Sequence, residues 1–519
     1  MKKIFIAAAL LTLASSCGKD FLNKTPIDQQ TDVNYYKTPQ DAFSALVATY
    51  SVLDWGDYGH IILTSEIASD DCFGGGGNTD GGWRQWDRFQ NYTDLNAAAW
   101  TKYYTGIFRA NTLLQKIANI DFGGNAALKN RYTAEARFLR AYFYFDLVRM
   151  FGNVPLLDAP LEPGQYDRPQ ANPDDVYKQI AQDLKFAAAN IPATAYSAIP
   201  QSEYGRATKW AAESLLGRVF LYYTGYYSKS EITGEVTRQD ARNAIEDVIT
   251  NSGYGLVDKF PNLWQAAQAS FVGEDNKETV FSIKYTWQGL GNWNSQNGNR
   301  WQVDIAIRNQ TLPPYYKGWG AATVNPKLYN AYEAGDTRKG ASIISIEDEN
   351  LTAFSQGDQY QYTGYYWKKY TPIVGMLAED KGGDFQIDNY YDYIAIRFAD
   401  VLLMGAELNL DADLSKAQNY YNMIRDRAFQ DIQHRKMLSG GSNGLQLIMQ
   451  ERRLELALEG MRYWDLLRQG IPVAKQAIDN SGMGADFDVS FRTETKGLLQ
   501  IPQTQVSLSN GSLKQNPGW

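Results

Sequence analysis

The hydrophobic positions between residues 97 and 252 repeat with the period of an α-helix. One set steps alternately by four and three residues, which places it on a single helix face: Ala134, Phe138, Ala141, Phe145 and Val148. Further helical segments are predicted at about 97–119, 208–226 and 238–251. The first half of the chain is therefore expected to form a stack of amphipathic helices.

Two helix starts are marked by capping signals. Thr38 precedes Pro39 and is followed three residues later by Asp41, which is typical of a capped start with proline in the first turn. Asn172 precedes Pro173 in the same way. These signals predict helices that begin at residues 39 and 173.

A second helical block is predicted between about 394 and 470, with segments at 394–408, 415–429 and 445–470. The intervening residues 253–393 are rich in Gly, Asn, Gln, Trp and Tyr and show little periodicity, apart from a short strand candidate at 279–285. We expect loops and short strands there, inserted on a helical scaffold, with a C-terminal segment at 471–519 after it. Binding residues tend to lie in such loops.

The N-terminus has the layout of an export signal. Lys2 and Lys3 precede an apolar stretch, and small residues then lead to Cys17. We predict a signal peptide at 1–16, lipidation of Cys17 as in a bacterial lipobox, and a polar tether at 17–37. An ordinary signal peptide with a chance cysteine is the alternative, because the nearest leucine lies four residues before the cysteine instead of three.

Composition narrows the classes of function. Two His and two Cys among 519 residues are too few for a His/Cys zinc site, an iron–sulfur centre or a disulfide scaffold. A net charge of −8 argues against nucleic-acid binding by phosphate neutralisation. The 13 Trp and 35 Tyr remain to be explained.

Four of the 13 tryptophans fall between residues 287 and 319, where an even spread would place about one. They are Trp287, Trp293, Trp301 and Trp319, and Asn294 and other amides lie among them. Indole stacks on the apolar face of a sugar ring, while amides and arginine bond its hydroxyls. We predict ligand contacts here; the alternative is that these indoles fill a small core under loops.

A second candidate segment is 69–93, which is rich in glycine and shows no apolar period. We expect a mobile loop there, not a helix or strand. Its candidate ligand contacts are Asp70, Asp71, Trp83, Arg84 and Trp86. The two aspartates are alternatively a calcium site or a solvated turn. Cys72 has no neighbouring His or Lys and is expected to be inert.

Several blocks along the chain resemble the SusD/RagB family of outer-membrane nutrient-uptake lipoproteins. The blocks are CGKDFL (17–22), EARFLRAYFYFDLVRMFGNVPL (135–156), ARNAIEDVITNSGYGL (241–256), IRFADVLLMGAEL from residue 396 on, MIRDRA (423–428), ERRLELALEGMRYWDLLR (451–468) and LLQIPQTQVSLSNGSLKQNPGW (498–519). The blocks are spread along the whole chain in the same order as in the family. They predict a single SusD-like domain at 38–519.

The resemblance implies a mainly α fold, built on tetratricopeptide-type helix pairs with an irregular, loop-rich ligand-binding part that contains short strands. It implies a cell-surface lipoprotein of the outer membrane that passes oligosaccharides to a TonB-dependent barrel of the SusC type. Family members of the starch-binding type contribute an acidic residue, an arginine and a tryptophan near the position of segment 69–93. Tyr365-Tyr366-Trp367 and the Asp336/Arg338 pair also resemble family blocks. The resemblance implies that both have a structural role.

Three functions remain open at this stage. The first is non-catalytic glycan binding without a cofactor, which the clustered tryptophans favour. The second is peptide binding of the RagB type, which would favour cationic clusters and backbone edges. The third is a surface glycoside hydrolase, which needs two carboxylates across a sugar, and the sequence shows no catalytic signature.

Overall fold

The computed structural model describes residues 35–56, 60–91, 94–479, 481 and 483–519. The predicted signal peptide, Cys17 and the tether up to residue 34 lie outside these residues, so the predictions made for them stay predictions. Among the described residues, no helix is both long and apolar enough to span a membrane.

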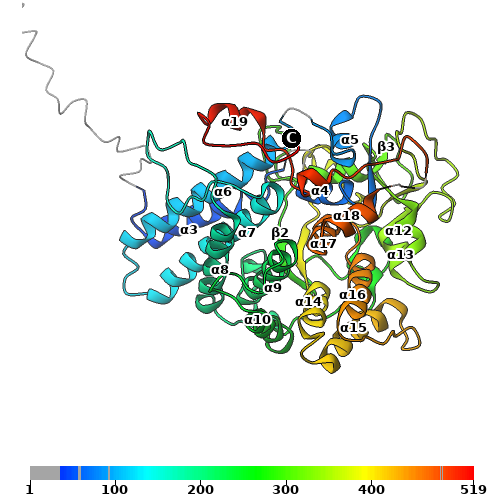
Figure 1. The fold of residues 1–519 in the computed structure, drawn as a ribbon. Helices are drawn as coiled ribbons and strands as arrows, with labels where there is room; N and C mark the ends of the chain where they lie inside the picture. Colours follow the sequence, from blue (N-terminus) through cyan, green and yellow to red (C-terminus); the bar gives the residue numbers. More distant parts are fainter. Residues whose placement is uncertain (1–34, 57–59, 92–93, 480, 482) are drawn as a thin grey trace, which may run out of the picture.

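The helices of the first half form a stack in which each packs against its neighbours in the sequence (Figure 1). They are α3 (Pro39–Tyr50), α6 (Ala97–Lys116), α7 (Ala126–Phe151), α8 (Pro173–Asn190), α9 (Lys209–Tyr226) and α10 (Arg238–Asn251). The bounds of α6, α9 and α10 lie close to the predicted segments, and α7 contains the predicted apolar face from Ala134 to Val148. The mainly α fold is confirmed.

Both predicted helix starts are also confirmed. The Thr38 hydroxyl accepts a hydrogen bond from the Asp41 N–H at 3.2 Å, and the Asp41 carboxylate accepts one from the Thr38 N–H at 2.8 Å. The Asn172 side chain accepts from the N–H of Asp174. These caps satisfy N–H groups that the first helical turn leaves without partners.

The second helical block packs on the first through α10 and α14 (Figure 1). Its helices are α14 (Phe398–Asn409), α15 (Leu414–Phe429), α16 (Ser442–Glu455) and α17 (Arg462–Arg468), followed by α18 (Ile471–Ile478) and α19 (Gln503–Leu508). The prediction of a single helix at 445–470 is wrong. The chain leaves the helix between α16 and α17, where Leu458 and Gly460 have φ values of 61° and 78°.

In the part of the chain that the structure describes, four short two-stranded sheets lie between and around the helices. The strands are β1 (Cys72–Gly75), β2 (Thr279–Ile283), β3 (Ile307–Arg308), β4 (Lys317–Gly318), β5 (Ala321–Val324), β6 (Ile343–Ser345), β7 (Tyr365–Trp367) and β8 (Tyr393–Arg397). Strand β2 confirms the candidate at 279–285. It pairs antiparallel with β8, so the helix predicted from residue 394 begins only at Phe398. Strand β8 is buried along its whole length, which is why its residues before Arg397 are apolar without alternation.

The prediction of a loop without elements at 69–93 is wrong. This segment contains β1, which pairs antiparallel with β5, and helix α5 (Gly81–Asp87). A Cβ atom at Gly74 would lie only 2.7 Å from the Cα of Arg84. Glycine at this position therefore allows the strand and the helix to pack closely. Close packing, and not only loop flexibility, explains why this segment is rich in glycine. The remaining short helices are α4 (Ile61–Ile67), α11 (Trp301–Ile305), α12 (Pro326–Ala331) and α13 (Arg338–Ser342).

A buried network of ion pairs joins α13, β8, α15 and α16. The carboxylate of Glu455 is fully buried and accepts hydrogen bonds from Arg338, Arg397 and Arg427. Arg338 also pairs with Asp336 at 2.7 Å. The structural role predicted for that pair is confirmed, and so is the one predicted for Tyr365-Tyr366-Trp367, because Tyr366 and Trp367 are buried in β7.

Candidate ligand-binding cavity

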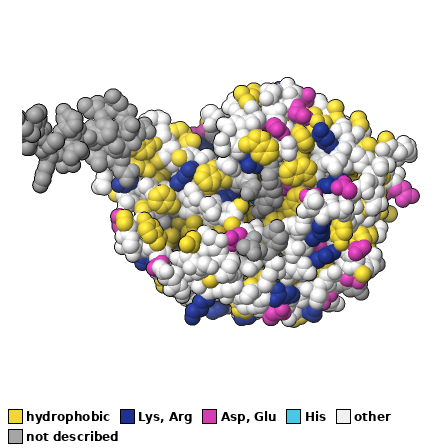
Figure 2. Space-filling model, turned by 90° about the horizontal axis from the view of Figure 1, so that it is seen from above, with side chains coloured by type: hydrophobic (Ala, Val, Ile, Leu, Met, Phe, Trp, Pro, Cys, Tyr) yellow, Lys and Arg dark blue, Asp and Glu magenta, His cyan; other side chains and the backbone are white. Residues whose placement is uncertain are grey.

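A cavity of about 440 Å³ opens where α4 and α6 begin, beside the loop at 287–300. Its lining includes Trp55, His60, Lys102, Gln296 and Arg300, together with the first turn of α6. Figure 2 looks onto the face of the molecule that carries α4, α5 and α19, and shows groups of hydrophobic side chains with basic ones between them. The volume lies within the range of ligand pockets, roughly 300–1,000 Å³.

The N-terminus of α6 faces this cavity without a side-chain cap. Asn96 stands at the capping position but makes no capping hydrogen bond. Its side chain is held elsewhere: it accepts from the indole N–H of Trp86 at 3.0 Å and donates to the main-chain oxygen of Gln500 at 3.0 Å. Ala97, Ala98 and Ala99 line the cavity directly after it. The partial positive charge of a 20-residue helix is thus left at the cavity wall.

Lys102 is a buried cation one turn further along α6. Its ammonium donates to the main-chain oxygen of Leu53 at 2.8 Å and lies 3.4 Å from Nε2 of His60. Burial lowers the pKa of Lys102 to about 8, although Asp146 and Asp54 act in the opposite direction. Burial and the neighbouring Lys102 lower the pKa of His60 well below its ordinary value, so His60 is neutral. Among the described residues, no carboxylate therefore neutralises the charge of Lys102 by direct contact.

Arg300 is the second buried cation of the cavity. One nitrogen, Nη2, donates to the main-chain oxygens of Trp293 at 2.9 Å and Ser295 at 2.6 Å. Its Nε is buried and has no hydrogen-bond partner. Arg300 is 7% exposed and forms no ion pair within the described part of the chain, which is unusual for a guanidinium at this depth.

The loop that Arg300 holds carries the most exposed of the predicted tryptophans. Trp293 is 50% exposed, and Asn294 beside it is also exposed. Trp287 is half-buried at the start of the loop. The loop is fixed at its tip as well, because the N–H of Gly291 donates to Asp388 at 2.6 Å. An accessible indole thus stands on an anchored loop whose residues Gln296 and Arg300 line the cavity.

Trp301 is unsuited to the ligand contact predicted for it, because it is only 1% exposed. Its ring packs against Tyr370 at a centroid distance of 5.2 Å and lies 6.3 Å from the ring of His60, which lines the cavity. A ring enclosed in this way has no free face for a sugar. Trp301 supports the residues behind the cavity instead.

Asp70 and Asp71 are also buried, in ion pairs with arginines of the second helical block. Arg462 pairs with Asp70 at 2.7 Å, and Arg453 donates to Asp71 at 2.8 Å. Burial alone would raise the pKa of Asp70, but Arg462 and Arg453 outweigh it and lower the pKa to about 2. The structure thus gives these aspartates a packing role, and neither the predicted ligand contact nor a calcium site fits carboxylates bound to guanidinium groups. Among the described residues, no group of three or more His, Cys, Asp or Glu side chains is placed to hold a metal ion.

The other residues predicted in segment 69–93 meet the tryptophan-rich segment in space. The rings of Trp83 and Trp319 lie 6.3 Å apart, and the guanidinium of Arg84 lies 4.4 Å from the ring centre of Tyr360. Trp83 and Trp86 are buried, whereas Trp319 and Arg84 are half-buried. This assembly packs α5 against the loops around β5, and it leaves less indole surface open than Trp293 does.

A second cavity adjoins the first. It has a volume of about 470 Å³ and shares Thr101 with the first cavity. Its walls are more apolar and include Tyr104, Leu157 and Leu513. Two exposed aromatic residues at its edge, Phe108 and Tyr166, are 54% and 68% exposed.

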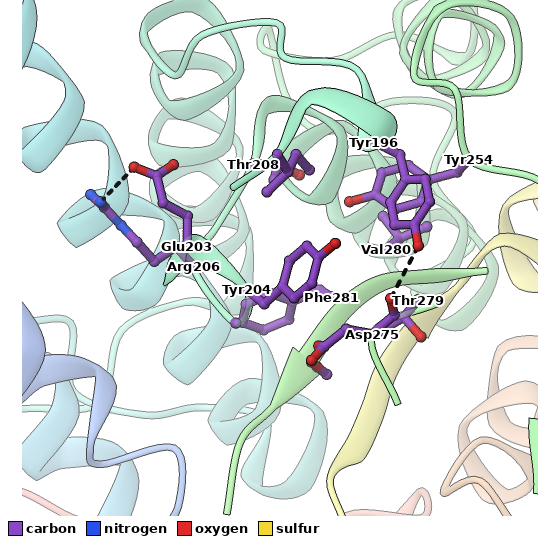
Figure 3. Close-up of a pocket in the computed structure, with 13 residues that line it drawn as sticks. Tyr196, Glu203, Tyr204, Arg206, Thr208, Tyr254, Asp275, Thr279, Val280 and Phe281 are labelled. Carbon is purple, nitrogen blue, oxygen red and sulfur yellow. Dashed lines mark hydrogen bonds and ion pairs between the residues drawn. The ribbon is translucent and has the colours of Figure 1, made fainter. Parts of the chain in front are cut away.

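A third and much smaller cavity is shown in Figure 3. Tyr196, Tyr204 and Tyr254 surround it, Tyr196 donates to the main-chain oxygen of Asp275, and Arg206 pairs with Glu203. Its volume of about 30 Å³ is enough for about two water molecules and too small for a sugar ring.

Sequence reasoning missed the residues that form the floor of the first cavity. Lys102 and Arg300 are isolated cations in the sequence, and Trp55 stands apart from other tryptophans. Their common location depends on how α3, α6 and the 287–300 loop pack. One signal was available for Arg300, since it lies directly before Trp301 within the tryptophan-rich segment.

Comparison with known proteins identifies the class of this fold. Residues 348–519 match the model of the SusD family, and residues 20–221 match a model described as starch-binding and associating with the outer membrane. The second description supports a location at the outer membrane.

Individual relatives match along nearly the whole chain. A structure described as a laminarin-binding SusD-like protein has a TM-score of 0.80 and 32% identity, and covers 93% of this chain and 100% of that one. Surface glycan-binding protein A from Bacteroides fluxus has a TM-score of 0.79 and 27% identity, over 93% and 100% of the two chains. SusD-like protein P2 of Formosa agariphila is 27% identical over 545 residues, which is 100% of this chain and 99% of that protein.

These matches define a mainly α protein of stacked helices with short inserted sheets. The chain belongs to the SusD/RagB family, as the resemblance of its sequence blocks predicted.

Proposed function

We propose that this protein binds oligosaccharides in the cavity beside α6 and passes them to a TonB-dependent outer-membrane barrel of the SusC type. The observation that supports binding most directly is the placement of Trp293. Its indole is 50% exposed on a loop whose following residues, Gln296 and Arg300, line a cavity of about 440 Å³.

This arrangement suits the two kinds of surface on a sugar. The ring presents an apolar C–H face, which stacks on an indole, and a rim of hydroxyls, which pair with amides and guanidinium groups. Trp55 and Trp293 supply the first kind of contact, and Gln296 and Arg300 supply the second. Two relatives, a laminarin-binding SusD-like protein and a surface glycan-binding protein, support the same class of ligand.

The adjoining apolar cavity supports a ligand of several sugar units. A chain that starts beside Arg300 reaches the second cavity across Thr101, where Tyr104 and Phe108 offer further aromatic surface. A hexasaccharide is therefore expected to bind more tightly than a disaccharide of the same linkage.

We further propose that the protein is a binding protein without catalytic activity, anchored to the outer membrane by lipid on Cys17. Replacing Cys17 with Ala is expected to release the protein from the membrane fraction. Co-purification of a large barrel protein with the unaltered chain tests the proposed partner. Recovery of shortened oligosaccharides after incubation would contradict the absence of catalysis.

Isothermal titration calorimetry of the purified protein against neutral and acidic oligosaccharides and against peptides tests the ligand class. We expect heat of binding with oligosaccharides, weakened at least about tenfold in Trp293→Ala, equivalent to about 1.4 kcal/mol. Trp519→Ala serves as the matched control, since this half-buried indole belongs to the C-terminal segment and does not line the cavity. Binding of peptides alone would contradict the proposal.

A further inference from the structure

We infer that the cavity beside α6 selects sugars that carry an oxyanion, either a carboxylate or a sulfate ester. The inference rests on the proposed function and specifies the substrate class of the same site. Three features of the cavity wall carry positive charge, and each is left without the partner that would ordinarily neutralise it.

The first feature is the pair of buried cations. Lys102 and Arg300 both line the cavity, are 8% and 7% exposed, and form no ion pair with any residue that the structure describes. Charged side chains at this depth are nearly always paired, because an unpaired charge loses its hydration. Other buried arginines of this chain follow that rule: Arg338 and Arg397 are both bound to carboxylates.

The second feature is the unused hydrogen-bonding capacity of Arg300. Its two acceptors are both bonded through Nη2, whereas Nε is buried without a partner. The N–H donors of a guanidinium suit the oxygens of a carboxylate or sulfate, and its positive charge compensates the charge of the oxyanion. Neutral hydroxyls satisfy single donors but leave the charge uncompensated.

The third feature is the uncapped start of α6. The side chain of Asn96 is bonded to Trp86, so the first turn of α6 meets the cavity without a side-chain cap, although the N–H of Ala97 donates to the main-chain oxygen of Asp94 at 2.9 Å. A helix N-terminus favours an anion, and an anionic ligand here would also lie within reach of Lys102 on the next turn.

The carboxylates near these groups do not neutralise the cavity wall by contact. Asp146 is paired with Arg149, and Asp54 acts on Lys102 only at longer range. Burial raises the pKa of Asp54 well above its ordinary value, which reduces its negative charge. Among the residues that the structure describes, none of those that line the cavity is acidic.

The test compares three hexasaccharides by calorimetry at low salt: a neutral β-1,3-glucan, a hexagalacturonate and a sulfated galactan. We expect at least one of the two anionic ligands to bind about tenfold or more tightly than the neutral one. That preference should fall in Arg300→Gln and persist in Arg435→Gln, which removes the same charge from an exposed ion pair remote from the cavity. Arg300→Lys retains the charge and should keep part of the preference, which separates charge from any loosening of the loop.

The failures of the two proposals are distinguishable. If the neutral glucan binds as tightly as both anionic ligands, the inference is wrong and the proposed function stands. If no hexasaccharide binds, the proposed function fails and the inference with it. An acidic hexapeptide that binds as tightly as the hexagalacturonate would overturn the assignment to sugars.

Discussion

Arg300 donates a hydrogen bond to the main-chain oxygen of Trp293 at 2.9 Å, so a buried cation that lines the cavity fixes the backbone of the residue that carries the exposed indole. The contact joins the two groups that the proposed site needs, one for the apolar face of a sugar and one for its polar rim. It also means that ligand contacts at Arg300 are coupled to the position of Trp293.

Trp293 and Trp301 are expected to respond in opposite ways to replacement by alanine. Trp293→Ala should reduce oligosaccharide affinity and change the free energy of unfolding by less than about 0.5 kcal/mol, because the indole is half exposed. Trp301→Ala should destabilise the protein by about 3–5 kcal/mol, because its ring is enclosed. Urea unfolding and calorimetry of both variants check this, and unchanged binding in Trp293→Ala would show that the site is misplaced.

Asp70 is expected to contribute stability, not ligand binding. Asp70→Asn leaves Arg462 and Arg453 without one of their carboxylates and should cost about 3–5 kcal/mol in the free energy of unfolding. Glu235→Gln is the matched control and should cost much less, since its partner Lys185 is largely exposed and screened by water.

The same carboxyl gives a pH dependence of known sign. The pKa of Asp70 is about 2 in the folded state, below its ordinary value of 3.8. The contribution of its ionised carboxylate to the free energy of unfolding is therefore fully present above pH 4. It is lost as the pH falls from about 4 to 2. The stability difference between wild type and Asp70→Asn should therefore shrink over that window, and a constant difference would contradict the assignment.

The affinity for an anionic oligosaccharide should fall as the pH rises through about 8. Lys102 has its pKa lowered to about that value by burial, and it loses its charge above it. The neutral β-1,3-glucan should show no such fall, and neither should the anionic ligand with Lys102→Met. Calorimetry between pH 6.5 and pH 9.5 measures the effect, and equal pH profiles for both ligands would argue against a role for Lys102.

The glycines of segment 69–93 are expected to differ in their tolerance of alanine. Gly76 has a φ of 72°, and a Cβ atom there would lie 2.9 Å from the ring of Trp83. Gly76→Ala should therefore destabilise the protein by more than about 1 kcal/mol. Gly81 has no atom within 4 Å of such a Cβ and opens α5, so Gly81→Ala should be neutral or slightly stabilising. Equal effects in thermal unfolding would count against close packing of this segment.

Much of the fold could be predicted from the sequence because its helices carry local signals. Periodicity gave the bounds of α9 and α10, and capping residues gave the starts of α3 and α8. The errors arose where tertiary contacts decide. Strand β8 has the apolar composition of a buried helix, and the glycines before α5 signal both flexibility and close packing.

The candidate site was only partly predictable for the same reason. Trp293 lies in a cluster that the sequence makes visible, but its exposure and the burial of Trp301 depend on the surrounding packing. The roles of Asp70 and Asp71 depend on arginines almost 400 residues away in the chain. Lys102 and Arg300 line the same cavity although they lie far apart in the chain, which no local pattern signals.

A crystal structure of the protein with a hexasaccharide that binds in calorimetry tests the central claim most directly. The account predicts sugar density in the cavity beside α6, with one ring against the indole of Trp293 and an oxygen within hydrogen-bonding distance of Arg300. Sugar bound only elsewhere, for example at Trp83 and Trp319 or at the tyrosines of Figure 3, would contradict it.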